Sequence, residues 1–249
     1  MKKLDFIVCG VQKAGTSTLH ALLGTHPGIA LPDKKELHFF DSAMVDWRAP
    51  DYRPYHAHFG AADPARLWGE STPVYVFRPE VLPRIRAYRA DIKLIVVFRD
   101  PVDRAYSHWC MNIASGLETL PFAEAVREDG RARAGSGNAS DFNRFSYVER
   151  GFYGEQLQRL LSLFPRENVL ALDFERIRSG QAALFADVCD FLGLPRPAEA
   201  PPQMHRLRRP ALQYPPAPTP ADRRYLEEIF AADAQTFATL SGFSTQRAA

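Results

Sequence analysis

The residues best suited to chemistry lie near the N-terminus, in a loop between a strand-like run and a helix-like run. Gly10 and Gly15 bracket this loop, Lys13 lies inside it, and the hydroxyl-bearing residues at positions 16–18 follow it. The free N–H groups of a helix start, together with hydroxyls and a lysine charge, are donors that bind phosphate. The sequence therefore predicts an anion-binding loop at residues 10–18.

The loop differs from the P-loop of nucleotide kinases and ATPases, G-x-x-x-x-G-K-[ST], in which lysine follows the second glycine. Here the glycine spacing is kept, but Thr16 stands at the lysine position and the lysine is Lys13. This difference weakens an ATP-binding interpretation. Taken alone, the loop also fits an ordinary turn between a strand and a helix.

A carboxylate and an imidazole follow at Glu36 and His38, within the segment Lys34–Asp41. In an extended backbone the two side chains share one side, with Leu37 and Phe39 on the other. Such a pair can accept a proton from an attacking group. A solvated pair on the surface is the commoner outcome, but the position just after the anion-binding loop favours a functional role.

A third candidate is Arg99, which follows the near-continuous apolar run at residues 92–98. Such a run predicts a central parallel strand, and ligands bind beyond the carboxyl ends of these strands. Ser107 lies about two helical turns later and can return to the same face as the helix start. An arginine and a hydroxyl suit a phosphate, although an ion pair of Arg99 with Asp103 fits the strand-end position equally well.

The elements that must position these groups follow from apolar periodicity. The expected strands are residues 6–9, 67–70, 92–98 and 168–173. The expected helices begin near residues 16, 79, 101, 147, 184 and 220. Irregular stretches are expected at 44–60, an aromatic loop typical of a binding lid, at 131–140, a mobile polar loop, and at the proline-rich 195–220. We therefore expect an α/β fold with a central parallel sheet flanked by helices, in a single domain over residues 1–249.

Composition narrows the function classes. The 46% hydrophobic content suits a globular chain, and a net charge of +2 is too small to indicate nucleic acid binding. No stretch reaches the length of a membrane span, and the interrupted start at residues 1–5 is not expected to be a signal peptide. Cys9, Cys110 and Cys189 lie in apolar patterns and predict free, buried thiols in a reducing compartment. His56-x-His58 lacks acidic or cysteine partners at ligand spacing, so no metal is expected.

Four motifs, in this order along the chain, resemble those of sulfotransferases that use 3′-phosphoadenosine 5′-phosphosulfate (PAPS), in particular the heparan sulfate and Golgi-type enzymes. Residues 10–18 are similar to the family's 5′-phosphosulfate loop. Residues 35–41 resemble the segment of heparan sulfate 3-O-sulfotransferases that carries the catalytic glutamate. Residues 70–75, Glu-Ser-Thr-Pro-Val-Tyr, are similar to their Glu-Lys-Thr-Pro-Ala-Tyr, and residues 99–107 resemble the 3′-phosphate motif.

The resemblance implies a P-loop-like, three-layer α/β fold and transfer of a sulfuryl group from PAPS to an acceptor hydroxyl, with an amine less favoured. The product would be adenosine 3′,5′-bisphosphate. Glu36 would be the general base, His38 would orient it or replace it, and Lys13 would stabilise the leaving phosphate. The cofactor-binding residues would be Lys13, Ala14, Gly15, Thr16, Ser17, Thr18, Arg99, Ser107, Arg206, Arg208 and Arg209. Glu70 would be a second carboxylate that positions the acceptor or Lys13, and Tyr75 of the same motif is a further candidate for binding the substrate. Trp47 is a substrate-binding candidate for another reason: the aromatic stretch suggests that rings or sugars stack there, although apolar packing explains it equally well.

The partner implied is a small-molecule, carbohydrate, lipid or carrier-bound acceptor. Ser71 replaces the family's lysine, and the cysteine-bonded loop of the heparan enzymes is absent before Arg206. A bacterial-style cytoplasmic enzyme therefore fits better than one acting on heparan sulfate itself.

Two other functions stay open at this point. A P-loop nucleotide or small-molecule kinase would share the strand–loop–helix layout, but Thr16 and Arg99 stand where its lysine and acidic metal site should be. A non-catalytic nucleotide-binding module would keep the loop and Arg99 without needing Glu36 and His38. Oligomeric state cannot be read from the sequence.

Overall fold

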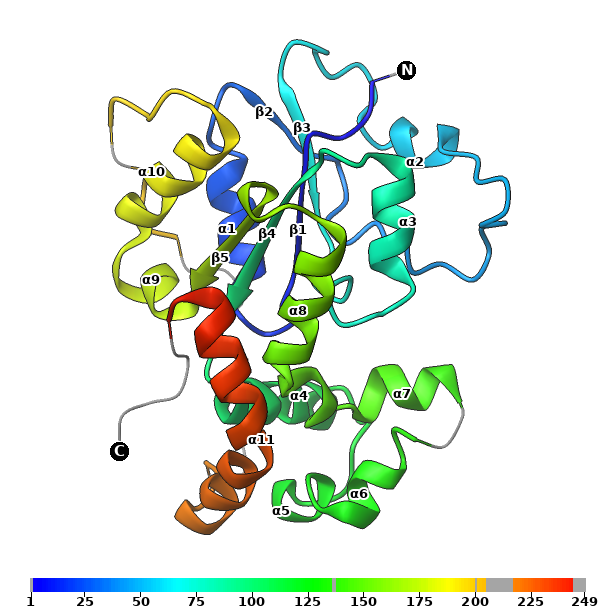
Figure 1. Ribbon diagram of the computed structural model, residues 1–249, viewed down its shortest axis with the longest axis vertical. Helices are drawn as coiled ribbons and strands as arrows, with labels where there is room; N and C mark the ends of the chain where they lie inside the picture. Colours follow the sequence, from blue (N-terminus) through cyan, green and yellow to red (C-terminus); the bar gives the residue numbers. More distant parts are fainter. Residues whose placement is uncertain (1, 136–137, 200, 205–216, 244–249) are drawn as a thin grey trace. The chain divides into compact units, whose positions relative to one another are not determined.

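The computed structural model describes residues 2–135, 138–199, 201–204 and 217–243 (Figure 1). The chain forms two compact units, which we call the sheet unit and the helical unit. The sheet unit comprises Met1–Phe98 and Arg159–Arg208, and the helical unit comprises Arg99–Gln158 and Arg209–Ala249. Each unit is built from two separate stretches of chain, and the single domain expected over residues 1–249 stays a prediction.

The sheet unit contains five parallel strands in the order β2-β3-β1-β4-β5. Their bounds are β1 Phe6–Gly10, β2 Ile29–Ala30, β3 Leu67–Ser71, β4 Lys93–Phe98 and β5 Val169–Asp173. Every residue of β1 is buried, as is typical of a central parallel strand covered on both faces. The predicted parallel sheet is therefore confirmed.

Helices connect and cover these strands, as parallel pairing requires. Figure 1 shows α1 and α10 on one side of the sheet and α3 on the other, so the arrangement has three layers. The helices of the sheet unit are α1 Thr16–Leu23, α2 Arg53–Ala57, α3 Val81–Tyr88, α9 Phe174–Ser179 and α10 Gln181–Leu192, with the 3₁₀ turn η2 Arg166–Asn168. Helix α8, Tyr153–Leu163, contributes residues to both units, since the division along the chain falls between Gln158 and Arg159.

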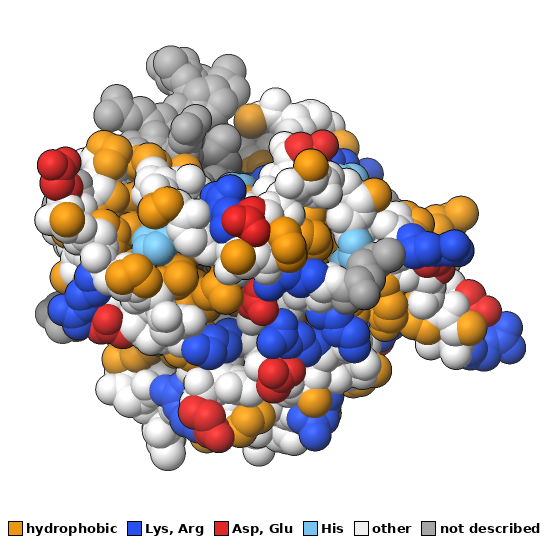
Figure 2. Space-filling model, turned by 90° about the horizontal axis from the view of Figure 1, so that it is seen from above, with side chains coloured by type: hydrophobic (Ala, Val, Ile, Leu, Met, Phe, Trp, Pro, Cys, Tyr) orange, Lys and Arg blue, Asp and Glu red, His pale blue; other side chains and the backbone are white. Residues whose placement is uncertain are grey.

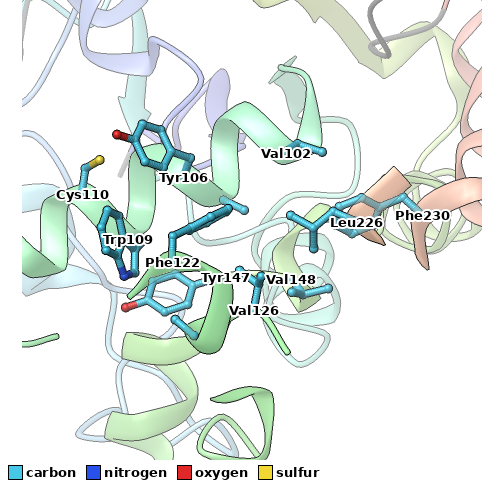
Figure 3. Close-up of a cluster of buried hydrophobic side chains, with 12 residues drawn as sticks. Val102, Tyr106, Trp109, Cys110, Phe122, Val126, Tyr147, Val148, Leu226 and Phe230 are labelled. Atoms are coloured by element: carbon cyan, nitrogen blue, oxygen red, sulfur yellow. The ribbon is translucent and has the colours of Figure 1, made fainter. Parts of the chain in front are cut away.

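The helical unit has its own apolar core. Its elements are α4 Pro101–Ala114, α5 Phe122–Ala125, α6 Glu128–Ala132, α7 Ala139–Phe145, the 3₁₀ turn η1 Glu149–Gly151, the start of α8, and α11 Pro220–Ser241. Figure 3 shows side chains from these elements packed together, among them Trp109 of α4, Phe122 of α5 and Leu226 of α11. Because these residues are far apart in the sequence, their burial ties α4, α5 and α11 to one another.

Two helix starts follow the local rules read from the sequence. Asp100 caps α4 by accepting a hydrogen bond from the Asp103 N–H (2.7 Å), with Pro101 in the first helical position. Thr219 and Asp222 form a reciprocal capping box at the start of α11. Both helices therefore begin where the sequence predicted, near residues 101 and 220.

Two expectations about the helical unit need correction. The loop expected at 131–140 is shorter, because α6 ends at Ala132 and α7 begins at Ala139. The guanidinium of Arg133 donates two hydrogen bonds to the buried Glu118 carboxylate (3.0 and 2.9 Å), a distant partner that no local pattern reveals. The helix expected from Tyr147 begins at Tyr153, because η1 and Phe152 precede it.

The surface and the cysteines agree with the composition. Figure 2 shows Lys and Arg side chains interspersed with Asp and Glu side chains over the face displayed. Cys9, Cys110 and Cys189 are free and buried, as predicted. Among the described residues, none of the helices combines the length and apolar character that a membrane crossing requires.

Candidate active site

The anion-binding loop leaves the sheet at its centre. Strand β1 lies between β3 and β4, and the N–H of Val11, just beyond β1, donates to the carbonyl of Val97 (2.9 Å). On the other side, the N–H of Val76 donates to the carbonyl of Cys9 (2.9 Å). Both flanking chains therefore fix the point at which the loop begins.

The loop has the local geometry of an anion cradle. Lys13 and Gly15 both have left-handed backbone angles, with φ of 73° and 79°. A Cβ on Gly15 would lie 3.1 Å from the Phe174 ring of α9, so the position needs glycine for space as well as for φ. Helix α1 begins at Thr16, so the hydroxyl-bearing residues 16–18 form its first turn, where N–H groups at a helix start are available to an anion.

The segment carrying Glu36 and His38 does not have the extended backbone considered in the sequence analysis. Glu36 has φ of 63° and His38 has φ of 52°, so both lie in the left-handed region. The N–H of Glu36 donates to the carbonyl of Ser71 at the end of β3 (3.1 Å), which holds the segment against the sheet edge as an irregular loop. The pairing of the two side chains is nevertheless present, with His38 Nε2 3.7 Å from Glu36 Oε2.

Charges alternate around this pair. Lys35 Nζ forms an ion pair with Glu36, and His38 Nδ1 lies 2.9 Å from Asp41 Oδ2. Partial burial alone would raise the pKa of Glu36, but the hydrogen bonds and charges of His38 and Lys35 outweigh it and lower that pKa to about 2. The hydrogen bond to Asp41, and then that to Glu36, raise the pKa of His38 to about 9. At neutral pH, Glu36 is therefore a carboxylate and His38 an imidazolium.

A second histidine, which sequence reasoning missed, lies beside this cluster. His20 of α1 has its Nδ1 2.9 Å from the hydroxyl of Ser71. Burial, and then the charge of Lys35, lower the pKa of His20 to about 4, so its imidazole is neutral at neutral pH. The available signal was its spacing of four residues from Thr16, which puts both on one face of α1. His20 thus bonds the residue, Ser71, that stands where the resembling family has a lysine.

The three candidate substrate residues are packed against protein groups. Glu70 is fully buried, and its carboxylate accepts hydrogen bonds from the hydroxyls of Tyr55 (2.8 Å) and Thr72 (2.7 Å). Burial raises the pKa of Glu70, and these hydrogen bonds counteract part of that rise. Tyr75 is also fully buried. The role of both in binding an acceptor stays a prediction.

Trp47 belongs to the aromatic stretch expected as a lid. Its ring packs against Phe39 and Phe40, with centroids 5.6 and 6.1 Å apart. The guanidinium of Arg84 lies 4.3 Å from the centre of the Trp47 ring. Apolar packing and this cation–π contact account for the position of Trp47 without a bound acceptor.

The 3′-phosphate candidates lie in the helical unit. Arg99 directly follows β4 in the chain, and Ser107 lies in the second turn of α4; both side chains are partly exposed among buried neighbours. Asp103, the alternative partner considered for Arg99, forms an ion pair with Arg223 of α11 (2.5 Å). Arg206, Arg208 and Arg209 lie outside the described residues.

The donors present suit a phosphosulfate, which needs hydrogen-bond donors and positive charge and no general acid. Lys13, the start of α1 and its hydroxyls supply them within a single loop. His56, one of the two histidines considered for a metal, has its Nε2 2.7 Å from the hydroxyl of Tyr88. Within the described part of the chain, no group of three or more His, Cys, Asp or Glu side chains is placed to hold a metal ion.

The chain belongs to the sulfotransferase domain family, whose model matches residues 3–209. Among its relatives is the mouse (Mus musculus) heparan sulfate glucosamine 3-O-sulfotransferase 3B1, which is 34% identical over 197 residues, covering 76% of this chain and 46% of the relative. The human (Homo sapiens) heparan sulfate glucosamine 3-O-sulfotransferase 6 is 34% identical over 194 residues, covering 76% and 52%. The chain thus spans about half the length of the curated relatives it matches.

Solved structures agree with this assignment. A sulfotransferase from Alicyclobacillus acidocaldarius superposes with a TM-score of 0.79 at 26% identity, covering 97% of each chain. Mouse sulfotransferase SULT7A1 complexed with PAP, at 14% identity and a TM-score of 0.58, covers 98% of this chain and 90% of that chain and shares the fold. The predicted family and the P-loop-like α/β fold are confirmed.

Proposed function

We propose that this protein transfers a sulfuryl group from PAPS to an acceptor hydroxyl. The observation that carries the proposal is that an unusual backbone conformation occurs at the residues expected to be catalytic. Among the described residues, the non-glycine positions with positive φ are Lys13, Glu36 and His38. These are the three residues to which the family resemblance assigns catalysis. Non-glycine residues persist in this region only when the surroundings hold them there, and they cluster at functional sites.

The donor would be held by its two charged ends. Lys13, Ala14 and residues 15–18 would bind the 5′-phosphosulfate through N–H groups, hydroxyls and the ammonium. Arg99 and Ser107 would bind the 3′-phosphate, and Arg206, Arg208 and Arg209 would close over the nucleotide. The product is adenosine 3′,5′-bisphosphate.

In the transfer step the acceptor oxygen forms a bond to sulfur while the bond from sulfur to the phosphate oxygen breaks. The proton of the acceptor passes to the Glu36 carboxylate. Negative charge grows on the departing phosphate, where Lys13 and the N–H groups of α1 stabilise it. Because His38 is an imidazolium at neutral pH, it serves as a hydrogen-bond donor that orients Glu36, and Glu36 is favoured over His38 as the base.

A pKa of about 2 makes Glu36 a weak base while Lys35 and His38 are bound to it. An acceptor hydroxyl that displaces Lys35 from Glu36 would raise the pKa of this carboxylate and make it more basic. Lys35 would then be available to the acceptor or the donor, in the region where Ser71 replaces the family's lysine.

We place the acceptor among carbohydrates, since the relatives named above are sulfotransferases of heparan sulfate glucosamine. Ser71, which stands where the family has a lysine, favours a small or carrier-bound carbohydrate. The three free, buried cysteines support a reducing, cytoplasmic compartment as a further proposal.

Thermal unfolding with two nucleotides tests the proposal against a kinase. Adenosine 3′,5′-bisphosphate at 100 times its dissociation constant should add about 2.7 kcal/mol to the free energy of unfolding. ATP with magnesium should add much less. Release of adenosine 3′,5′-bisphosphate from PAPS, dependent on a carbohydrate acceptor, then distinguishes an enzyme from a binding module. Stabilisation by ATP with magnesium alone would instead identify a kinase.

A further inference from the structure

The loop that carries Glu36 and His38 is held through its backbone N–H groups. The N–H of Glu36 donates to the carbonyl of Ser71 (3.1 Å), and the N–H of Leu37 donates to the Glu70 carboxylate. The N–H groups of Phe39 and Phe40 both donate to the hydroxyl of Tyr75, at 3.0 and 3.3 Å. The acceptors are a main-chain carbonyl and two buried side chains, all within residues 70–75.

The two side chains are linked to each other. Burial and then the charge of Glu70 raise the pKa of Tyr75, and the Tyr75 hydroxyl is one of the groups that counteract the rise in the pKa of Glu70, so the two side chains lie next to each other. Both side chains are fully buried, and so neither is free to bond water instead. The resulting chain runs from the Glu70 carboxylate through Tyr75 to the N–H groups of Phe39 and Phe40.

These contacts explain how the loop keeps a backbone that its residues disfavour. Glu36 and His38 have φ of 63° and 52°, a region that residues with a Cβ rarely adopt. Their neighbours Leu37, Phe39 and Phe40 supply N–H groups to Glu70 and Tyr75, which an extended backbone would direct elsewhere. The side chains of Glu36 and His38 meet because of this backbone.

We propose that Glu70 and Tyr75 are positioning residues that hold the loop of residues 36–40 so that Glu36 and His38 face the acceptor. This inference rests on the proposed function for its catalytic consequence, but its structural part can be measured separately. It assigns to these residues a role through the backbone of the catalytic loop and not through contact with the acceptor.

Tyr75→Phe is the direct test, because it removes one oxygen and keeps the buried ring. Tyr88→Phe is a matched control. Tyr88 is buried to the same degree, packs against Phe40 as Tyr75 does, and accepts a hydrogen bond from the N–H of Leu4 (2.8 Å). The two variants make the same chemical change in the same aromatic cluster, but only Tyr75 bonds the catalytic loop.

Amide hydrogen exchange tests whether Tyr75 holds the backbone of the loop. In Tyr75→Phe, exchange should speed up at Phe39 and Phe40 and stay unchanged at Leu4, while Tyr88→Phe should give the reverse. Unchanged exchange at Phe39 and Phe40 in Tyr75→Phe overturns the inference. This measurement needs no turnover, so it stands even if the protein proves not to use PAPS.

Steady-state kinetics test whether holding the loop matters for turnover. Misplacement of a catalytic group by about 1 Å can cost about 100-fold, so kcat of Tyr75→Phe should fall about 10- to 100-fold. The affinity for adenosine 3′,5′-bisphosphate should stay unchanged, because the anion-binding loop is not altered. Tyr88→Phe should keep kcat. An equal loss in both variants, or a raised acceptor KM at unchanged kcat in Tyr75→Phe, overturns the positioning role.

Glu70→Gln provides the graded variant. Glutamine can still accept from the N–H of Leu37 with its carbonyl oxygen, and its amide can donate to the hydroxyl of Tyr55 or Thr72. We expect Glu70→Gln to retain more kcat than Glu70→Ala and to speed exchange at Leu37 less. Equal loss in both variants would contradict a role through these hydrogen bonds.

Discussion

At the scale of single residues, the candidate site is a row of alternating charges. Lys35, Glu36, His38 and Asp41 contact one another in that order, and each charge is stabilised by its neighbour. An ionised carboxylate with movable cationic partners is suited to receiving a proton once an acceptor has displaced one of them. The neutral imidazole of His20 lies beside this row without adding charge.

Glu36→Gln should lower kcat by about 100-fold or more, because the amide cannot accept the proton of the acceptor. The fold should be retained, since the substitution preserves shape at a partly exposed position. Initial rates with PAPS and a carbohydrate acceptor measure the effect. Glu80→Gln makes the same change at a carboxylate that bonds Arg78 (2.7 Å) and should leave kcat unaltered. A retained rate in Glu36→Gln would transfer the role of base to another group.

Lys13→Ala should also lower kcat by about 100-fold or more, because it removes a charge that stabilises the departing phosphate. Adenosine 3′,5′-bisphosphate should bind more weakly as well, which calorimetry can measure. Lys34→Ala, at an exposed lysine outside the loop, is the control and should alter neither quantity. Equal effects of the two variants would show a general charge effect in place of a contact.

At the scale of elements, the anion-binding loop depends on a neighbour from a distant part of the chain. Phe174 and Ile177 of α9 lie within 3.3 Å of where a Gly15 side chain would begin. The turn from β5 into α9 thus forms the back wall of the loop between β1 and α1. Position 15 therefore needs glycine for two reasons: its left-handed backbone angle and the lack of space for a Cβ atom.

Gly15→Ala should therefore weaken nucleotide binding and lower the free energy of unfolding. Gly193, the residue after α10, has φ of 75° against 79° for Gly15, and a Cβ there would meet nothing within 4 Å. Gly193→Ala thus incurs only the backbone strain of about 1 kcal/mol or more. Chemical denaturation should show the larger loss for Gly15→Ala, and calorimetry should show weaker binding of adenosine 3′,5′-bisphosphate in that variant alone. Similar losses in both variants would mean that Phe174 yields without cost.

Long periodic elements could be predicted from the sequence, and short ones could not. The apolar run expected at 92–98 is β4 at 93–98, and the helix expected after Thr219 is α11. Strand β2 has two residues and α6 has five, so neither carries a periodic pattern of its own. Such elements form because distant partners such as Glu118 and Arg133 hold them.

In the candidate site, too, the sequence predicted some features and not others. Residue types and spacing predicted that Glu36 and His38 would lie together, and the structure places their side chains 3.7 Å apart. The left-handed backbone at both positions could not be predicted, because it depends on Ser71, Glu70 and Tyr75. The spacing of His20 from Thr16 was a signal in the sequence, but its neutral state was not, because that state results from burial near Lys35.

At the scale of the whole molecule, the charges around His38 make stability depend on pH. The pKa of His38 is raised from 6.5 to about 9, so its protonation stabilises the folded state fully below pH 6.5 and no longer above pH 9. The pKa of Glu36 is lowered from 4.5 to about 2, so its contribution is full above pH 4.5 and is lost as the pH falls towards 2. Both contributions are complete between pH 4.5 and 6.5.

The difference in free energy of unfolding between the wild type and His38→Gln should consequently shrink as the pH rises from 6.5 through 9. The side chains of His38 and Glu36 are both more than 40% exposed, so solvent screening keeps this difference in free energy small. Urea denaturation of both proteins at a series of pH values measures the difference, and groups common to both cancel. A difference that grows with pH would mean that His38 is not held as a cation by Glu36 and Asp41.

The sealed position of the three thiols makes the molecule convenient for spectroscopy. Burial raises the pKa of Cys9 to about 12, and Cys110 and Cys189 are equally enclosed, so maleimide reagents should leave the native chain unlabelled. Met44, in the aromatic stretch, is 93% exposed. A cysteine introduced there would be the sole site for a fluorophore, with no need to remove any natural thiol, and its emission would report movement of that stretch when an acceptor binds.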